Sequence, residues 1–433
     1  MEQHNSYEIH VPYLVLRCLR TFILQIRLFC MQPEAKIYYI TRDIERAVGM
    51  TPGPNYHIIS NKTPYGESIK QQYPDFVTLL NSPDGRSLGT GALMEHPETV
   101  TIVPSGSSVL VFKNTARIEP IVAAKGWKMI NPKATLSETV ENKISQVEWL
   151  GELGKKYLPT HNIIVARRLT WTGEPFVLQW AHGHTGGGTI LVRSEAELKS
   201  LQQKFPERMT RRTTYIQGPS FTINAIVAAD KILVGNISYQ ITGLAPFTDN
   251  AFSTVGNDWA VPNTLLNTDE IEYIETMVSD IGKKLNISGW RGLYGVDVIK
   301  DDKRDTIHLI EINARQPAST SFESFLQNEN RVKGDDGFTT FETHLKAMLG
   351  EKIDKPLIPV NDGAQIIQRI TRLKRDVNHK IKNSLELSGY QAVIYQNTEY
   401  NTDLIRIQSL KNITEGNGKL NENGRKIVSI ISD

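Results

Sequence analysis

The chain has 433 residues, a formal net charge of +2, 39% hydrophobic residues and 22% charged residues. These values are typical of a globular protein with two or three domains. They exclude a nucleic-acid-binding protein, because the charge is nearly balanced and no dense Lys/Arg cluster occurs. The two cysteines, Cys18 and Cys30, allow neither a disulfide framework nor a metal quartet, which favours a reducing compartment and a cytoplasmic location.

Residues 1–33 read as an N-terminal extension. Its apolar stretch contains Arg17, Arg20 and Arg27, so insertion into a membrane would be costly, and no secretory cleavage site follows. We interpret the extension as the product of an upstream start or, alternatively, as a targeting or docking segment.

Residues 34–132 alternate short apolar runs with turn-rich segments, which predicts a small α/β domain with a parallel sheet. Strands are expected at 36–40, 56–60 and 99–103, and a helix at 116–125, ahead of residues 127–130. After residue 350, Pro356 and Pro359 indicate a linker. Residues 356–433 then predict a small, mainly β C-terminal domain, with β-like runs at 364–370, 390–395, 404–408 and 426–431.

Between these two regions the pattern changes. Thr135 and Glu138 match a capping box and predict a helix that carries Lys143, with Val140, Ile144 and Val147 on one face. A second capping box is expected at Ser194 and Glu197. The remaining expected elements are strands at 162–165, 176–179, 189–192, 213–216 and 221–227, and helices at 194–203 and 271–285.

The segment from residue 292 to 315 is the most informative part of the sequence. Two apolar runs, each interrupted by one acid (Asp297 and Glu311), are joined by a charged turn and predict a β-hairpin. Burying a carboxylate is unfavourable unless a cation or hydrogen bonds compensate. Asn313 and Arg315 follow Glu311 at intervals of two, so they are expected on the same face. Two carboxylates and an amide oxygen predict a Mg²⁺ site of the kind that binds phosphates.

A glycine-rich loop at 182–189 separates two of the expected strands. Glycines allow backbone N–H groups to approach an anion, although this loop is not a Walker A motif. Alone it would fit a flexible hairpin turn equally well. Together with the acidic hairpin, the loop more strongly indicates a cradle for an anion such as a phosphate.

These residues resemble the ATP-grasp superfamily over roughly residues 35 to 345. The order of elements matches, and Glu311-Ile-Asn313-Ala-Arg315 is its most specific motif. The resemblance implies three domains after the extension: a pre-ATP-grasp α/β domain (34–132), a two-lobed ATP-grasp domain (133–350, lid at about 160–215) and the C-terminal domain (356–433).

The resemblance also implies roles for individual residues. The nucleotide phosphates would be contacted by Lys143 (the α-phosphate) and covered by Gly186, Gly187 and Gly188 (the β- and γ-phosphates). The adenine would be bound by Thr214, Tyr215 and Ile216. Mg²⁺ (or Mn²⁺) would be held by Asp297, Glu311 and Asn313, and Arg315 would act with Glu311 in catalysis.

Two positions depart from the family pattern. Gln179 stands where a second phosphate-binding lysine is usual, and Ser220 stands where an acid usually binds the ribose. Gln179 can still donate to or accept from the nucleotide, but it carries no charge. The chain is therefore expected to be a divergent member.

The function implied is an ATP- and Mg²⁺-dependent ligase. It would activate a small carboxylate as an acyl phosphate, join it to an amine (or a thiol), and release ADP and phosphate. The alternatives are a degenerate nucleotide-binding module and an ATP-grasp kinase. Neither a nucleic acid nor a membrane is an expected partner, and a homodimer is left open.

Overall fold

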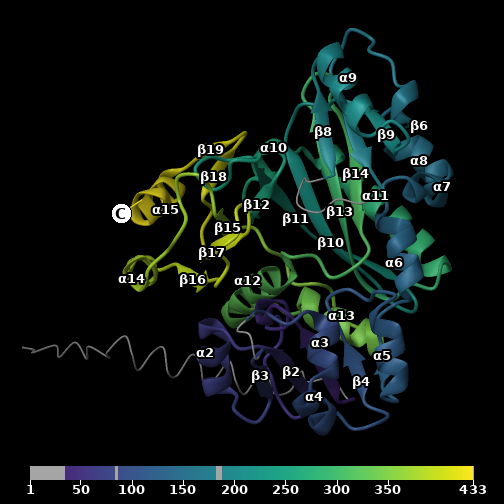
Figure 1. Ribbon diagram of the computed structural model, residues 1–433. Coiled ribbons are helices and arrows are strands. Elements are labelled where there is room, and N and C mark those ends of the chain that lie inside the picture. Colours follow the sequence, from purple (N-terminus) through teal and green to yellow (C-terminus); the bar gives the residue numbers. More distant parts are fainter. Residues whose placement is uncertain (1–34, 83–85, 182–187, 433) are drawn as a thin grey trace, which may run out of the picture.

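The computed structural model describes residues 35–82, 86–181 and 188–432. Within these ranges the strands form a parallel N-terminal sheet, a lid sheet, a large antiparallel sheet and a small ribbon. In Figure 1 the N-terminal sheet lies at the bottom, the lid at the upper right and the C-terminal segment on the left. The predicted combination of a parallel α/β domain with a two-lobed grasp is confirmed.

The N-terminal sheet has the order β3-β2-β1-β4-β5, and all its pairs are parallel. Alternate side chains of β1 face different helices, since Tyr39 packs with Phe341 and Tyr38 packs with Leu93. The elements are β1 (Ile37–Thr41), η1 (Ile44–Arg46), β2 (Tyr56–Asn61), α2 (Pro64–Gln72), β3 (Val77–Leu80), α3 (Thr90–Glu95), α4 (Pro97–Ile102), β4 (Ser108–Leu110), α5 (Ile118–Ala124) and β5 (Lys128–Met129).

The strand predicted at 99–103 is wrong, because this segment belongs to helix α4. Pro97 occupies the first turn, and the His96 side chain accepts a hydrogen bond from the backbone N–H of Glu98. A proline at the first helical position is compatible with a helix and fixes its start. The alternation of Val and Thr favours a strand, but the His96 cap and Pro97 favour a helix start, and the helix forms.

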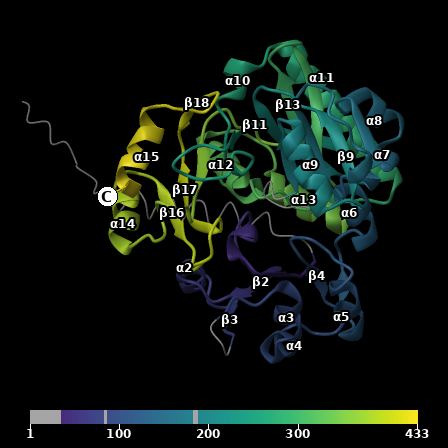
Figure 2. The same ribbon diagram turned by 45° about the horizontal axis from the view of Figure 1, so that its top comes forward.

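The lid sheet has the order β6-β9-β7-β8 and its own small core, which includes Leu178, Val192 and Leu198. Its elements are β6 (His161–Val165), η2 (Ala166–Arg168), β7 (Phe176–Trp180), β8 (Thr189–Val192), α9 (Glu195–Lys204) and β9 (Met209–Thr214). Ser194 caps α9 as predicted, but the Glu197 carboxylate accepts from the N–H of Arg193 and not from that of Ser194. Figure 2 shows the lid beside β13 and away from the C-terminal strands.

The large sheet has the order β14-β13-β10-β11-β12-β15-β17-β16. Helix α11 covers one face, where Ile274 and Met277 join the same core as Phe221 and Ile223. Helix α13 lies on the other face and also packs against the N-terminal sheet through Phe341. The strands and helices of this region are β10 (Ser220–Val227), β11 (Ile232–Thr242), β12 (Thr254–Asp258), α10 (Pro262–Leu265), α11 (Thr268–Ile287), β13 (Gly292–Asp301), β14 (Thr306–Asn313), α12 (Thr320–Lys333) and α13 (Thr340–Leu349).

The single helix predicted around Lys143 is wrong. Two short helices, α6 (Ala134–Glu141) and α7 (Ser145–Leu150), are separated by a turn and followed by α8 (Glu152–Tyr157). Helix α6 begins at Ala134 without a side-chain cap, so the predicted Thr135 capping box does not form. The Asn142 side chain instead accepts hydrogen bonds from the N–H groups of Ile144 and Ser145, and this local bond competes with a continuous helix.

The C-terminal strands continue the large sheet, because β15 pairs with β12 and β17 pairs with β15. The elements after β15 (Ala364–Arg369) are α14 (His379–Leu387), β16 (Gln391–Ile394), β17 (Asp403–Ser409), β18 (Thr414–Gly416), β19 (Lys419–Leu420) and α15 (Glu422–Ser432). The strand predicted at 426–431 is wrong, because it lies in α15, where Ile427 and Ile431 face the core one turn apart. Over the described residues, no helix combines the length and apolar character needed to cross a membrane.

Candidate active site

The predicted acidic hairpin is present. Asp297 on β13 lies directly opposite Glu311 on β14. The flanking Val296 and Val298 face the α11 core, so the two acids point to the other side of the sheet. Thr222 Oγ1 donates to one Asp297 oxygen at 2.7 Å, and Asn313 Nδ2 donates to the other at 3.1 Å. The structure therefore brings together the three residues expected to hold the metal.

Lys143 lies at the same place, although it leaves a turn and not a helix. Its Nζ is 2.5 Å from Glu311 Oε1, and its backbone N–H donates to the carbonyl of Ala181 at the end of β7. The side chain is almost fully buried. Lys143 thus links the acidic hairpin to the end of β7, which leads into the glycine loop.

The pKa values of the two acids are shifted in opposite directions. Burial, together with the Glu311 charge, raises the pKa of Asp297. Burial would also raise the pKa of Glu311, but the charges of Lys143, Arg315 and Arg211 outweigh it and lower that pKa. Glu311 is thus held as a carboxylate, and a nearby cation would do the same for Asp297.

Arg315 belongs to a second cluster that borders the first. Its Nη1 donates to Glu141 Oε1 at 2.5 Å, and Lys113 binds the other oxygen of Glu141. Glu141 ends α6, Lys113 follows β4 and Arg315 follows β14. The cluster therefore connects all three segments, and the sequence analysis missed Glu141 and Lys113 because nothing local distinguishes them from surface charges.

Arg211 is a further residue that the sequence analysis missed. It is only 2% exposed, and its Nε and Nη2 donate to Gln179 Oε1 at 2.8 and 2.6 Å. The remaining acceptors are Gln146 Oε1 and the Ile310 carbonyl, and no ion pair to Arg211 is found among the described residues. Burial lowers the pKa of Arg211 to about 10. A buried cation thus lies beside the amide that stands at the usual lysine position.

The hinge between the lid and the large sheet differs slightly from the predicted strand. Thr214 ends β9, whereas Tyr215 and Ile216 lie outside both sheets, in the connection to β10. Gly218 is needed in this connection, because a Cβ there would lie 1.9 Å from the Lys300 carbonyl oxygen. The hinge thus packs against the acidic hairpin.

The glycine loop is only partly described. Gly186 and Gly187 lie outside the described residues. Gly188 is buried, and its carbonyl accepts from the Trp180 N–H at 2.9 Å across the β7–β8 pair.

The donor set fits Mg²⁺ together with phosphates. Each Asp297 oxygen accepts one hydrogen bond and keeps lone pairs free, and Glu311 is ionised. Across the described chain, no group of three or more His, Cys, Asp or Glu side chains could complete a metal site by itself. Magnesium is commonly held by one or two carboxylates plus substrate phosphates, so the incomplete protein set suits it.

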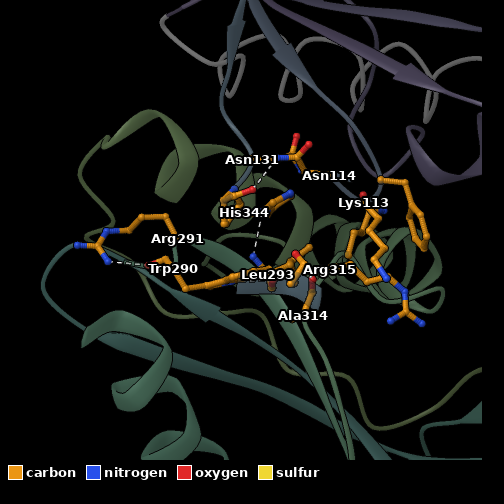
Figure 3. Close-up of a pocket in the computed structure, with 13 residues that line it drawn as sticks. Lys113, Asn114, Asn131, Trp290, Arg291, Leu293, Ala314, Arg315 and His344 are labelled. Atoms are coloured by element: carbon orange, nitrogen blue, oxygen red, sulfur yellow. Dashed lines mark hydrogen bonds between the residues drawn. The ribbon is translucent and has the colours of Figure 1, made fainter. Parts of the chain in front are cut away.

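A pocket between the N-terminal domain and the large sheet adjoins this site (Figure 3). Lys113 and Arg315 lie at one end of it, with Trp290 and Arg291 on the opposite side. His344 contributes to the lining, and its Nδ1 accepts from the Leu293 N–H at 3.1 Å.

The domain has two lobes: a lid sheet joined by a hinge to the large sheet, with an acidic hairpin that Lys143 and Arg315 face. The ATP-grasp domain family matches residues 140–319. Residues 140–319 therefore form an ATP-grasp domain. The fold of nearly the whole chain is shared with solved structures.

Three solved structures illustrate the likeness over almost the whole chain. N5-carboxyaminoimidazole synthetase from Staphylococcus aureus complexed with ADP has a TM-score of 0.62 at 11% identity, covering 92% of this chain and 98% of that chain. N5-carboxyaminoimidazole synthase from Aspergillus clavatus, in complex with ADP and 5-aminoimidazole ribonucleotide, has a TM-score of 0.63 at 13% identity, covering 92% and 99%. L-amino acid ligase from Bacillus licheniformis has a TM-score of 0.59 at 14% identity, covering 93% and 98%. At such identities the likeness establishes the fold, and no curated protein sequence matches this chain.

Proposed function

We propose that this chain is an ATP-dependent carboxylate–amine ligase that forms ADP. The observation that carries the proposal is the convergence of Asp297, Glu311 and Asn313 with Lys143 and Arg315 at the junction of the lobes. The neighbours named as a synthetase with ADP and as an amino acid ligase support this class of reaction.

In this proposal a substrate carboxylate oxygen attacks the γ-phosphorus of ATP, the bond to the β-phosphate oxygen breaks, and ADP leaves. An amine then attacks the acyl carbon of the acyl phosphate, and phosphate departs as the amine loses a proton. When bound at Asp297, Glu311 and Asn313, Mg²⁺ would neutralise charge on the phosphates.

The protein's own residues would neutralise charge, stabilise the oxyanion and exclude water. Lys143 places a buried positive charge beside the phosphates, and Arg315 offers hydrogen bonds to the oxyanion that forms at the acyl carbon. Arg211 would supply the charge that Gln179 lacks. The lid would exclude water, because an acyl phosphate hydrolyses readily.

Hydroxylamine trapping tests the proposal without knowledge of the natural amine. The full-length chain is incubated with ATP, Mg²⁺ and pooled small carboxylates, and hydroxamates are read by mass spectrometry. Glu311→Gln should lower the yield about 100-fold or more, since several kcal/mol of charge stabilisation is lost. Glu275→Gln, on the exposed face of α11, is the matched control and should behave as wild type.

Wild-type yield in Glu311→Gln would contradict the proposed roles. Nucleotide binding without any hydroxamate would favour the degenerate binding module. A stable phosphate ester in place of free phosphate would favour the kinase.

A further inference from the structure

The loops after β1 and β4 meet at the switch point of the N-terminal sheet. The chain runs from β1 outward to β2 and β3, then crosses to β4 and β5 on the other side. In open parallel sheets, ligands bind in the crevice at the carboxyl ends of the strands where the order reverses. Arg46, at the end of η1, and Phe112, just after β4, both lie at this crevice.

Among the described residues, the Arg46 guanidinium has no ion-pair partner. Its Cζ lies 4.4 Å from the centroid of the Phe112 ring. Its Nε and Nη1 are buried and have no hydrogen-bond partner in the described part of the chain. Stacking on an aromatic ring leaves the edge of a guanidinium free to form paired hydrogen bonds with an oxyanion.

The nearest acids along the chain are already engaged. Asp43 pairs with Arg42 at 3.1 Å, and Glu45 accepts from Tyr395 Oη at 2.8 Å. Over residues 35–82, 86–181 and 188–432, no carboxylate lies within ion-pair distance of Arg46. A partly buried cation without a counter-ion is unfavourable, so an anion from outside would stabilise this arrangement.

The same crevice adjoins the candidate active site. Arg315 Cζ lies 5.9 Å from the Phe112 ring that Arg46 also contacts. Gln316, the next residue, donates through Nε2 to the Arg46 carbonyl at 2.7 Å and through its backbone to the Phe112 carbonyl. Phe112 and Arg315 also line the pocket of Figure 3. The two arginines therefore lie on one ring, with one facing the metal-binding hairpin and one at the switch point.

We propose that Arg46 binds a second anionic group, a carboxylate or a phosphate, on the non-reacting end of the acid substrate. The reacting carboxylate would lie toward Arg315 and the acidic hairpin. The substrate class is then a short dicarboxylate or a phosphorylated acid. The assignment to a substrate rests on the proposed function, whereas the anion site itself does not.

The test is calorimetric titration of the full-length chain saturated with ADP and Mg²⁺, so that the nucleotide site is filled. The probes are glutarate, pentanoate (the same carbon chain with one carboxylate) and inorganic phosphate. Variants are Arg46→Gln, Arg46→Lys and the matched control Arg42→Gln, whose side chain is exposed in the same loop.

Glutarate or phosphate should bind to wild type and to Arg42→Gln, and at least about tenfold more weakly to Arg46→Gln. Arg46→Lys keeps the charge but loses the fork, so its affinity should be intermediate. It also carries the test if Arg46→Gln fails to fold. Pentanoate should bind weakly to all four proteins. Preferential binding of glutarate over phosphate would identify a dicarboxylate, and the reverse a phosphorylated acid.

Equal affinity in wild type and Arg46→Gln, or no binding of either anion to wild type, would overturn the inference. Its failure is distinguishable from failure of the ligase proposal. Anion binding that depends on Arg46 without any hydroxamate would retain the site and reject the reaction. Hydroxamate formation together with unchanged anion binding in Arg46→Gln would retain the ligase reaction and reject the Arg46 anion site.

Discussion

Arg211 is a buried cation whose hydrogen-bond partners are neutral: two amide oxygens and a backbone carbonyl. Neutral acceptors compensate the buried charge of Arg211 only in part, and a nucleotide phosphate would complete this compensation. Arg211→Met should therefore weaken ATP binding by about 10- to 100-fold, the value of a lost charged hydrogen bond. Isothermal titration with ATP and Mg²⁺ measures it.

Arg212→Met is the matched control for this prediction. Arg212 is adjacent on β9 but donates to Thr172 on the exposed side, so its loss should change the affinity less than about twofold. Gln179→Lys combined with Arg211→Met should recover part of the affinity. Unchanged ATP binding in Arg211→Met, with a lower unfolding midpoint, would make Arg211 a structural residue only.

His344 gives the protein a sensitivity to acid. Burial lowers the pKa of His344 to about 3, from an ordinary value of 6.5. The group is therefore neutral when folded and protonated when unfolded below pH 6.5. Its contribution to stability is fully present above 6.5 and is lost as pH falls toward the folded pKa. The free energy of unfolding should drop by about 2–3 kcal/mol between pH about 6.5 and 4.5.

Urea denaturation across this pH range measures the effect, with His344→Asn as the comparison. Asn can still accept the Leu293 N–H but does not titrate, so its stability should depend less steeply on pH. At neutral pH the variant should lose about 1 kcal/mol of packing. Parallel pH profiles for the two proteins would contradict the role of His344.

At the scale of elements, the turn between α6 and α7 positions Lys143. Asn142 Oδ1 holds this turn by accepting from two backbone N–H groups. Asn142→Ala should cost about 1 kcal/mol of stability and also weaken nucleotide binding, because Lys143 would lose its fixed backbone. Asn142→Asp keeps an acceptor oxygen and should retain the stability. An alanine variant with wild-type stability and affinity would show that the turn forms without this cap.

The acidic hairpin and the turn at Asn142 show where prediction from sequence succeeds and where it fails. The acidic hairpin could be predicted, because buried acids in two apolar runs have few explanations, and Asp297 and Glu311 do face each other. The break at Asn142 could not, since the apolar spacing of Val140, Ile144 and Val147 fits one continuous helix. Local hydrogen bonding of an Asn side chain overrode that periodicity.

Arg211 shows a second limit. Arg211 and Arg212 are adjacent in one strand, and sequence alone does not say which faces inward. The register between Gln179 and Arg211 decides it, together with an irregularity in β14 that leaves the Ile310 carbonyl within reach of the guanidinium. Both are long-range features, as are the contacts that join Lys113, Glu141 and Arg315.

At the scale of the whole molecule, the large sheet runs without interruption from the acidic hairpin to the C-terminal strands. Ile405 on β17 lies in the same core cluster as Phe221 on β10. The Asp258 carboxylate, at the end of β12, accepts from the N–H groups of Ile413 and Thr414 and ties the C-terminal segment to the sheet. The nucleotide-binding and C-terminal regions should therefore unfold together.

Ile405→Ala tests this coupling. The side chain is fully buried, so its truncation should cost about 2–5 kcal/mol, whereas Leu373→Ala, in a side chain 93% exposed, should cost less than about 0.5 kcal/mol. If the sheet is one cooperative unit, Ile405→Ala will shift the urea midpoints of circular dichroism and of ATP-binding loss by the same amount. An independent C-terminal domain would instead produce a separate early transition and leave the midpoint for loss of ATP binding unchanged. Because β15 is hydrogen-bonded to β12 along the sheet, we expect the single shifted transition.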